Sequence, residues 1–201
     1  MKARHFALAV TGASGVVYGW RLVQELLRSG IRVSVLISSA GFAVLKQECG
    51  LDWGGAGVDV AQELCHHLGC DRAALSYYAE NDFFAPIASG SSAPDAMIVA
   101  PCSMGTLSRI SSGNSGNLLE RSADVMLKEG RPLVLVPRET PLNAIHLEHM
   151  LKLTRLGVKI VPAMPGFYQN PETLDDLVDF VVGKVLDSVG VEHALFRRWG
   201  N

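Results

Sequence analysis

Residues 97–121 read MIVAPCSMGTLSRISSGNSGNLLER, and this stretch decides the predicted fold. Its apolar start, 97–100, is predicted as a buried parallel strand that ends at Pro101, since proline lacks the N–H that a strand uses in pairing. Ser103 and Thr106 then place hydroxyls beside the free backbone N–H groups of a predicted helix start, where anions bind well. The pattern outlines a phosphate cradle, although it also fits an ordinary capped helix of an α/β protein.

The rest of the chain alternates extended apolar runs with amphipathic ones, which predicts a doubly wound α/β fold of the Rossmann or flavodoxin kind. We expect a mainly parallel sheet with helices on both faces, in a single domain over residues 1–201. The predicted strands are His5–Val10, Arg32–Ile37, Ala96–Ala100, Leu133–Val136 and Lys159–Val161. The stretch 50–92 is the least regular, with a short helix predicted over 61–68. Ligands of such sheets bind at the carboxyl ends of the strands, so function is expected there.

Composition limits the function classes. Hydrophobic residues make up 48% of the 201 residues and charged residues 19%, a sparsely charged surface that predicts an oligomer. The formal charge of -2 provides no global field for nucleic acid. No apolar run approaches a membrane span or a secretory signal, and four cysteines form no disulfide framework, so the cytoplasm is expected. Of Cys65, His66, His67 and Cys70, only His66 and Cys70 share a helix face, so no metal site is expected.

The loop after the first strand, TGASGVVYG at 11–19, is glycine-rich and suggests a nucleotide. A nicotinamide dehydrogenase would need an acidic residue after the second strand, where this chain has Ser38, and no tyrosine is followed by lysine four residues later. Flavin mononucleotide (FMN) fits better, because its phosphate and ribityl chain suit the hydroxyls of Ser14, Ser38, Ser103 and Thr106.

Two cationic features accompany these turns. Arg121 and Lys128 are seven residues apart on a helix predicted over Asn117–Glu129, hence on one face. Arg138 and Glu139 follow the fourth strand. Such charges are commonly only solvated, but Arg138 ends a strand at the same edge as both small-residue turns.

Several motifs cover nearly the whole chain: TGASGVVYG, SGSSAPDAM, PCSMGTLSRI, GNLLERSADVMLKE, RPLVLVPRETPL, IHLEHMLKL, PAMPGFYQNP and DFVVGKVLD. Together they resemble the motifs of UbiX-type flavin prenyltransferases. The resemblance implies transfer of a dimethylallyl group from dimethylallyl phosphate, or the pyrophosphate in some members, to N5 and C6 of reduced FMN without a metal. It also implies a homododecamer whose sites draw on neighbouring subunits, and a product that serves UbiD-type decarboxylases.

The resemblance assigns site residues position by position. The flavin-binding set is Gly12, Ala13, Ser14, Ser38, Ser103, Met104, Gly105, Thr106 and Arg138. The prenyl-phosphate set is Ser89, Gly90, Arg121, Lys128, Tyr168 and Lys184, and the reaction site is lined by Glu48, Glu139 and Trp199. Ser14, Arg121 and Lys128 also count among the catalytic residues. Two positions depart from some relatives: Phe83 replaces Trp, and Lys184 replaces Arg.

The chemistry explains these residue types. Ionisation of an allylic phosphate leaves negative charge on the leaving group, which the cations would hold, and positive charge on carbon, which aromatic rings would face while they exclude water. Glu48, Glu139 or the departed phosphate could take the proton from flavin C6. Two alternatives stay open: an FMN-dependent cysteine-type decarboxylase of related fold, and a non-enzymatic flavin carrier.

Overall fold

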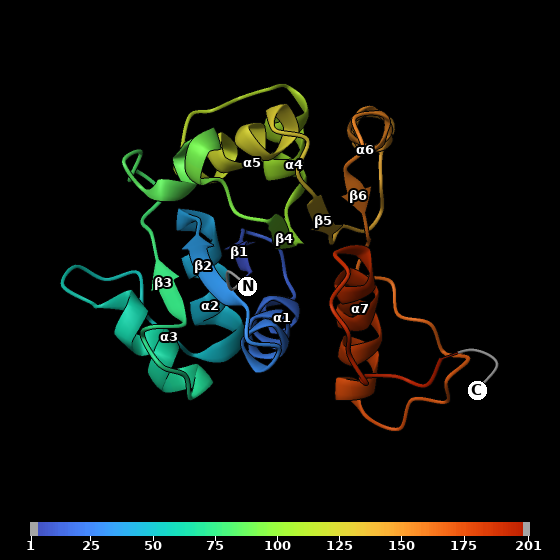
Figure 1. The fold of residues 1–201 in the computed structure, drawn as a ribbon. Helices are drawn as coiled ribbons and strands as arrows, with labels where there is room; N and C mark the ends of the chain where they lie inside the picture. Colours follow the sequence, from blue (N-terminus) through green and yellow to red (C-terminus); the bar gives the residue numbers. More distant parts are fainter. Residues whose placement is uncertain (1–3, 199–201) are drawn as a thin grey trace.

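The computed structural model describes residues 4–198, which form one six-stranded sheet in the order β3-β2-β1-β4-β5-β6 (Figure 1). Every neighbouring pair of strands is parallel. The strands are β1 (His5–Val10), β2 (Arg32–Ile37), β3 (Leu75–Tyr77), β4 (Ala96–Cys102), β5 (Leu133–Pro137) and β6 (Lys159–Ile160). The chain order reverses at β1, so the turns after β1 and β4 lie beside the crevice where ligands of such sheets bind.

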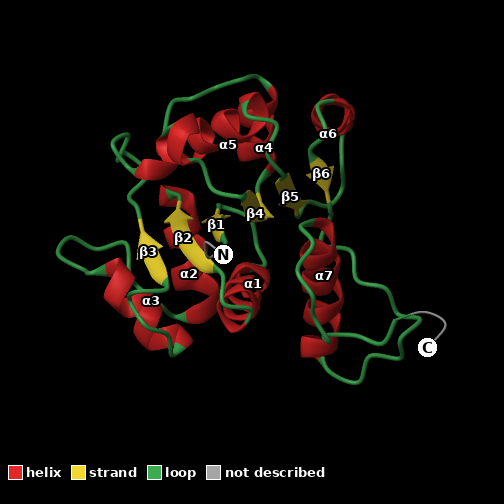
Figure 2. Cartoon of the chain, viewed as in Figure 1, coloured by secondary structure: helices red, strands yellow, loops and turns green. Residues whose placement is uncertain are grey.

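Helices cover both faces of the sheet (Figure 2). One face carries α1 (Val16–Arg28), α2 (Ser39–Cys49), α3 (Val60–Leu68) and α7 (Leu174–Ser188). The other carries α4 (Met104–Ser111), α5 (Leu118–Lys128), α6 (Ala144–Arg155) and the short 3₁₀ helices η1 (Pro86–Ala88) and η2 (Gly90–Ser92). The predicted doubly wound α/β fold is confirmed.

The alternation of side chains along each strand builds two cores. Phe6 and Leu8 of β1 pack under α1 and α7, whereas Ala7 and Ala9 pack under α4 and α5. All four are fully buried, which is why the strands read as continuous apolar runs. Each fully buried leucine-sized side chain contributes about 1.5–3 kcal/mol, so these cores fix the sheet on which the site is built.

Helix α1 packs closely against strand β4 at Gly19. A β-carbon on Gly19 would lie 2.6 Å from the carbonyl oxygen of Ala100, so only glycine lets the helix approach β4 this closely.

The structure corrects two details of the predicted strands. Pro101 does not end β4, which continues to Cys102. A register shift separates Val99 from Cys102 in the pairing with β5, and proline is tolerated at such an irregularity. The stretch 50–92 contains β3, which the sequence did not reveal because the strand is three residues long and buries only Leu75.

Other predicted elements are confirmed with small shifts. The first two strands have the predicted bounds, and the helix predicted over 61–68 begins one residue earlier, at Val60. The helix predicted over Asn117–Glu129 is α5, with those two residues as its caps. No helix within residues 4–198 has the length and apolar character needed to cross a membrane.

Candidate functional site

The turns after β1, β2, β4 and β5 meet at the carboxyl edge of the sheet, as predicted. Thr11 joins two of them, because its hydroxyl donates to the carbonyl of Pro101 (2.8 Å) and accepts from the N–H of Ser103 (2.8 Å). The N–H of Ser38 donates to the carbonyl of Val10 (3.0 Å), and that of Arg138 to Cys102 (3.3 Å). The four turns are therefore held at fixed separations by buried or half-buried hydrogen bonds.

The start of α4 has the geometry of an anion site. Ser103 caps the helix: its hydroxyl accepts from the N–H of Thr106 (3.3 Å) and donates to the Thr106 hydroxyl (3.1 Å). The first-turn N–H groups of Met104 and Gly105 have no carbonyl one turn earlier in the helix. Together with the positive end of the helix dipole, they suit a negatively charged ligand.

The start of α1 is different, because an internal carboxylate already fills it. Glu48 of α2 accepts from the N–H groups of Gly15 (3.0 Å) and Val16 (3.0 Å). Gly15 has φ 106°, a left-handed conformation that favours glycine. Burial acts to raise the pKa of Glu48, but hydrogen bonds from Ser14, Gly15 and Val16 and the charge of Arg138 outweigh it, so the pKa lies below its usual value. Glu48 is therefore ionised at neutral pH.

Arg138 completes this group after β5. Its Nε donates to the carbonyl of Ser14 (3.2 Å), which uses one of the five N–H donors of the guanidinium. Its neighbour Glu139 accepts from the N–H of Thr140 (3.0 Å). The structure thus brings Ser14, Glu48 and Arg138 together at one edge.

These residues fit a flavin mononucleotide by the chemistry of their donors. Ser38 is buried and caps α2, and Gly12 has no room for a side chain, since a β-carbon there would lie 2.5 Å from that of Ala40. Gly12 therefore serves close packing of the turn, with Ala13 buried beside it. Hydroxyls, free first-turn N–H groups and one cation are the donors that a phosphate and a polyol require.

A second group lies on the opposite face of the sheet from α1 and α7. Arg121 of α5 donates from Nε to the carbonyl of Ala88 (3.1 Å), and the Nζ of Lys128 lies 2.9 Å from where a Gly90 β-carbon would be. The two cations therefore face the same segment, which contains Ser89 and Gly90. Each also has an acidic neighbour, Asp124 at 3.3 Å for Arg121 and Glu129 at 2.5 Å for Lys128.

Tyr168 and Lys184 form a third group on the α7 face. Tyr168 packs edge-on against Phe180 with ring centroids 5.7 Å apart. The Nζ of Lys184 lies 5.0 Å from the ring centre of Phe196 and 5.6 Å from that of Phe180. Phe180 belongs to the core under α1 and α7, so one chain does not bring this group to Arg121 and Lys128. Trp199 lies outside the described residues.

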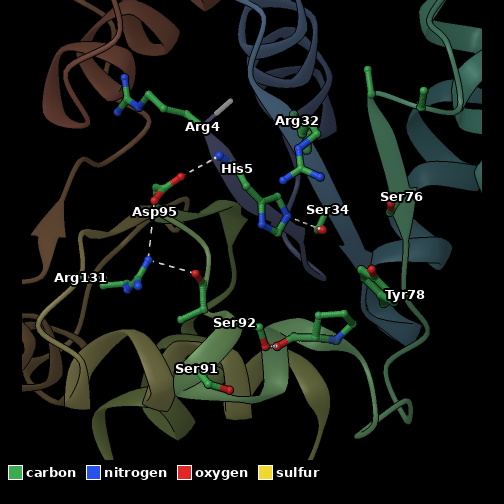
Figure 3. A pocket seen from close by; sticks show the side chains of 15 residues that line it. Arg4, His5, Arg32, Ser34, Ser76, Tyr78, Ser91, Ser92, Asp95 and Arg131 are labelled. Carbon is green, nitrogen blue, oxygen red and sulfur yellow. Dashed lines mark hydrogen bonds and ion pairs between the residues drawn. The ribbon is translucent and has the colours of Figure 1, made fainter. Parts of the chain in front are cut away.

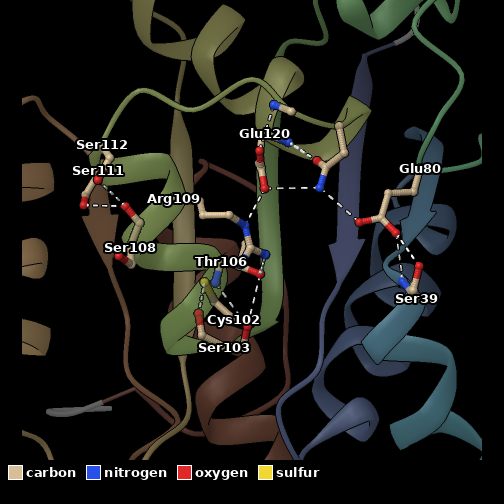
Figure 4. Close-up of polar contacts among 12 residues, drawn as sticks. Ser39, Glu80, Cys102, Ser103, Thr106, Ser108, Arg109, Ser111, Ser112 and Glu120 are labelled. Atoms are coloured by element: carbon tan, nitrogen blue, oxygen red, sulfur yellow. Dashed lines mark hydrogen bonds and ion pairs between the residues drawn. The ribbon is translucent and has the colours of Figure 1, made fainter.

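The structure reveals a polar network that sequence reasoning missed (Figure 4). It runs from Arg109 of α4 through Glu120 and Asn117 of α5 to Glu80 and then to Ser39 at the start of α2. Beside it is a cavity of about 570 Å³, lined in part by Phe42, Tyr77, Phe83, Glu80 and Asn117. The N-x-x-E spacing of Asn117 and Glu120 is a helix-cap signal that could have marked one link.

Another cavity, of about 500 Å³, lies at the amino ends of the strands (Figure 3). Two of its arginines have structural partners: Arg4 donates to the carbonyl of Val189 (2.8 Å), and Arg131 to those of Ala93 and Pro94 (both 3.0 Å). This cavity is at the opposite edge from the predicted site and contains none of its residues.

The cysteine and histidine cluster of α3 has a packing role. The ring of His67 lies 5.6 Å from Trp53 and 6.1 Å from Trp20. Cys65 is buried, and burial together with the neighbouring Cys65 raises the pKa of the Cys70 thiol to about 12. Within the part of the chain that the structure describes, no three His, Cys, Asp or Glu side chains are grouped so as to hold a metal ion.

Comparison with known proteins gives close matches over the whole chain. Residues 1–186 match the Flavoprotein family. The chain is 55% identical to the flavin prenyltransferase UbiX of Halalkalibacterium halodurans, over 97% of this chain and 93% of that protein. The crystal structure of AnUbiX (PadA1) in complex with FMN and dimethylallyl pyrophosphate superposes with a TM-score of 0.86 at 38% identity, covering 100% of this chain and 99% of that one. A dodecameric FMN-dependent UbiX-like decarboxylase from Escherichia coli also gives 0.86, at 42% identity, covering 98% of this chain and 100% of that one.

Proposed function

The chain belongs to the UbiX family of flavin prenyltransferases, and from that premise we propose which of its residues carry each part of the reaction. It is an enzyme that transfers a dimethylallyl group to FMN. Reduced FMN, when bound, supplies the nucleophilic N5 and C6 atoms of the flavin ring. We propose that residues 1–201 act as one flavin-binding domain and that its product is the cofactor of a UbiD-type decarboxylase.

The observation that carries the residue assignment is the meeting of Ser14, Glu48, Ser103 and Arg138 at the carboxyl edge. The start of α4, with the N–H groups of Met104 and Gly105 and the hydroxyls of Ser103 and Thr106, would hold the flavin together with Ser38 and Arg138. Glu48, ionised and bound to the start of α1, would fix the Ser14–Gly15 turn and offer a carboxylate to the reacting edge. Glu139 would be the second carboxylate there.

Arg121 and Lys128, with Ser89 and Gly90, would hold the phosphate of the prenyl donor. Two cations near one leaving group stabilise the negative charge that grows on it as the carbon–oxygen bond breaks. This electrostatic stabilisation is stronger in a pocket that excludes solvent than in bulk water, because the effective dielectric constant is lower there. Tyr168 and Lys184 would bind the same phosphate. Phe83 and Trp199 would place aromatic rings against the allyl group.

This division implies that the complete site needs more than one subunit, because Tyr168 and Lys184 lie on the opposite face from Arg121 and Lys128. We propose a homo-oligomer, and a dodecamer as its form. In support, α6 and its end expose large apolar side chains: Ile145 is 61% exposed, Leu147 54%, Leu151 51% and Leu156 60%. Several large apolar side chains left exposed on one helix are typical of a protein–protein interface. Four free cysteines suit the reducing cytoplasm, which we propose as the compartment.

The direct test is to incubate the purified protein with reduced FMN and dimethylallyl phosphate, or the pyrophosphate, and to measure the mass of the flavin product. Addition of one dimethylallyl group is expected with at least one donor. Decarboxylation of a cysteine-type substrate, or flavin bound and released unchanged with both donors, would contradict the assignment. The purified protein should also retain FMN and not a nicotinamide nucleotide, because Ser38 replaces the acid that holds the ribose diol of NADH and no tyrosine is followed by lysine four residues later.

A further inference from the structure

Arg109 and Glu120 form a half-buried ion pair beside the start of α4. Nε of Arg109 lies 2.5 Å from Oε1 of Glu120. The Glu120 side chain is 3% exposed, whereas that of Arg109 is 46% exposed. Glu120 also accepts from the side-chain amide of Asn117 (3.2 Å) and the N–H of Gly116 (2.9 Å). The carboxylate is thus fixed in the protein, and it holds Nε of a guanidinium whose terminal nitrogens lie on a half-exposed side chain.

The terminal nitrogens of that guanidinium lie at the start of α4 (Figure 4). Nη2 of Arg109 is 3.4 Å from the hydroxyl of Thr106, and Nη1 is 3.4 Å from where a Gly105 β-carbon would be. Gly105 and Thr106 belong to the turn assigned to the flavin, and Gly105 is exposed. Because Gly105 has no side chain, the guanidinium of Arg109 can lie close to the first turn of α4.

The charge of Arg109 acts at this turn. Burial raises the pKa of the Cys102 thiol, at the end of β4, to about 12, and Arg109 is the charged residue that opposes this rise. The other cation at the edge, Arg138, lies at the Ser14 side. The two arginines therefore border the carboxyl edge from α4 and from the turn after β5.

We propose that Arg109 is a further flavin-binding residue and that the buried Glu120 is the positioning residue that directs its guanidinium. The proposal rests on the flavin prenyltransferase assignment and adds to it a contact between Arg109 and an electron-rich oxygen of FMN. That oxygen belongs either to the phosphate or to a ring carbonyl. A planar guanidinium already held through Nε keeps its terminal N–H groups oriented for such an oxygen.

The same network extends beyond the ion pair. Asn117 donates to Glu80 (3.0 Å), which accepts from the hydroxyl (2.7 Å) and the N–H (2.9 Å) of Ser39. Glu120 is therefore linked through two residues to the turn after β2, which contains the predicted flavin residue Ser38. Hydrogen bonds thus connect the start of α4 with the turn after β2 through Glu120, Asn117 and Glu80.

The test measures binding of FMN and of riboflavin to the flavin-free full-length protein by fluorescence quenching, without any prenyl donor. Arg109→Gln is expected to raise the dissociation constant for FMN about ten- to a hundredfold, the effect of losing a charge-assisted hydrogen bond. Arg72→Gln is the control, because Arg72 pairs with Asp59 at 3.1 Å on an exposed surface. If only FMN binding is weakened, Arg109 contacts the phosphate. If riboflavin binding is weakened equally, Arg109 contacts the flavin ring.

The double variant Arg109→Gln/Glu120→Gln separates binding from folding. It removes the ion pair without leaving a buried charge unpaired, so it also decides the matter if Arg109→Gln alone does not fold. FMN affinity as weak as in the single variant, at a melting temperature near that of the control, supports the proposal. Recovery of FMN affinity to within about twofold of the control overturns it. The prenyl-transfer function is judged separately, by the mass of the product.

Discussion

Replacement of Lys128 by methionine tests the prenyl-phosphate group most directly. The Nζ of Lys128 lies 2.5 Å from Oε1 of Glu129 and beside Gly90, with its side chain 48% exposed. A half-exposed ion pair contributes about 0–1 kcal/mol to stability, so the fold should hardly change. If Lys128 donates a charge-assisted hydrogen bond to the donor phosphate, its loss costs about 1.5–3 kcal/mol, which lowers kcat/KM roughly ten- to a hundredfold.

The assay is steady-state prenylation of reduced FMN at low dimethylallyl phosphate concentration, with flavin occupancy measured by absorbance. Lys46→Met is the matched control, since Lys46 forms an ion pair with Asp52 at 2.6 Å in which both side chains are 63% exposed. We expect FMN affinity near wild type in both variants and a loss of kcat/KM only in Lys128→Met. A turnover within about twofold of the control would refute the reasoning, because that is the size of a surface-charge effect.

Four further predictions follow from the site and the core. Glu48→Gln should retain FMN but slow single-turnover prenylation about tenfold or more, and an unchanged rate would exclude a role for the carboxylate. Because the pKa of Glu48 is lowered in the folded protein, the ionised carboxylate stabilises the fold at pH values above its ordinary pKa of 4.5. This stabilisation is lost as the pH falls through the pKa of the folded state. Wild type and Glu48→Gln that unfold equally in acid would contradict this. Gly19→Ala should cost about 1–3 kcal/mol in urea unfolding through the clash with β4, and a cost below about 0.5 kcal/mol would show that the helix can shift. At pH 8 a thiol reagent should modify the exposed Cys49 in the folded protein but not the buried Cys102, as peptide mass analysis would reveal; labelling of both would mean that β4 opens.

The amino-acid sequence by itself determined five of the six strands of this protein and the helices α3 and α5. Phe6 to Val10 and Val33 to Ile37 are buried on both faces of a parallel sheet, so their apolar runs could be recognised without a structure. The carboxyl-edge location of Ser103 and Arg138 followed from their places directly after predicted strands, since the carboxyl ends of parallel strands lie at one edge of a sheet. The short strand at Leu75 escaped because three residues with one buried side chain carry too little pattern.

Only the tertiary structure decided which polar groups meet. Glu48 binds the start of α1 across 33 residues of sequence, and Arg109 binds Glu120 across 11. The same structure separates Tyr168 and Lys184 from Arg121 and Lys128, although the resemblance assigns all four to one pocket. The physical reason is the range of the interactions. Hydrophobic periodicity is a local property of the chain, whereas an ion pair or a shared pocket depends on how helices pack across the two faces of the sheet.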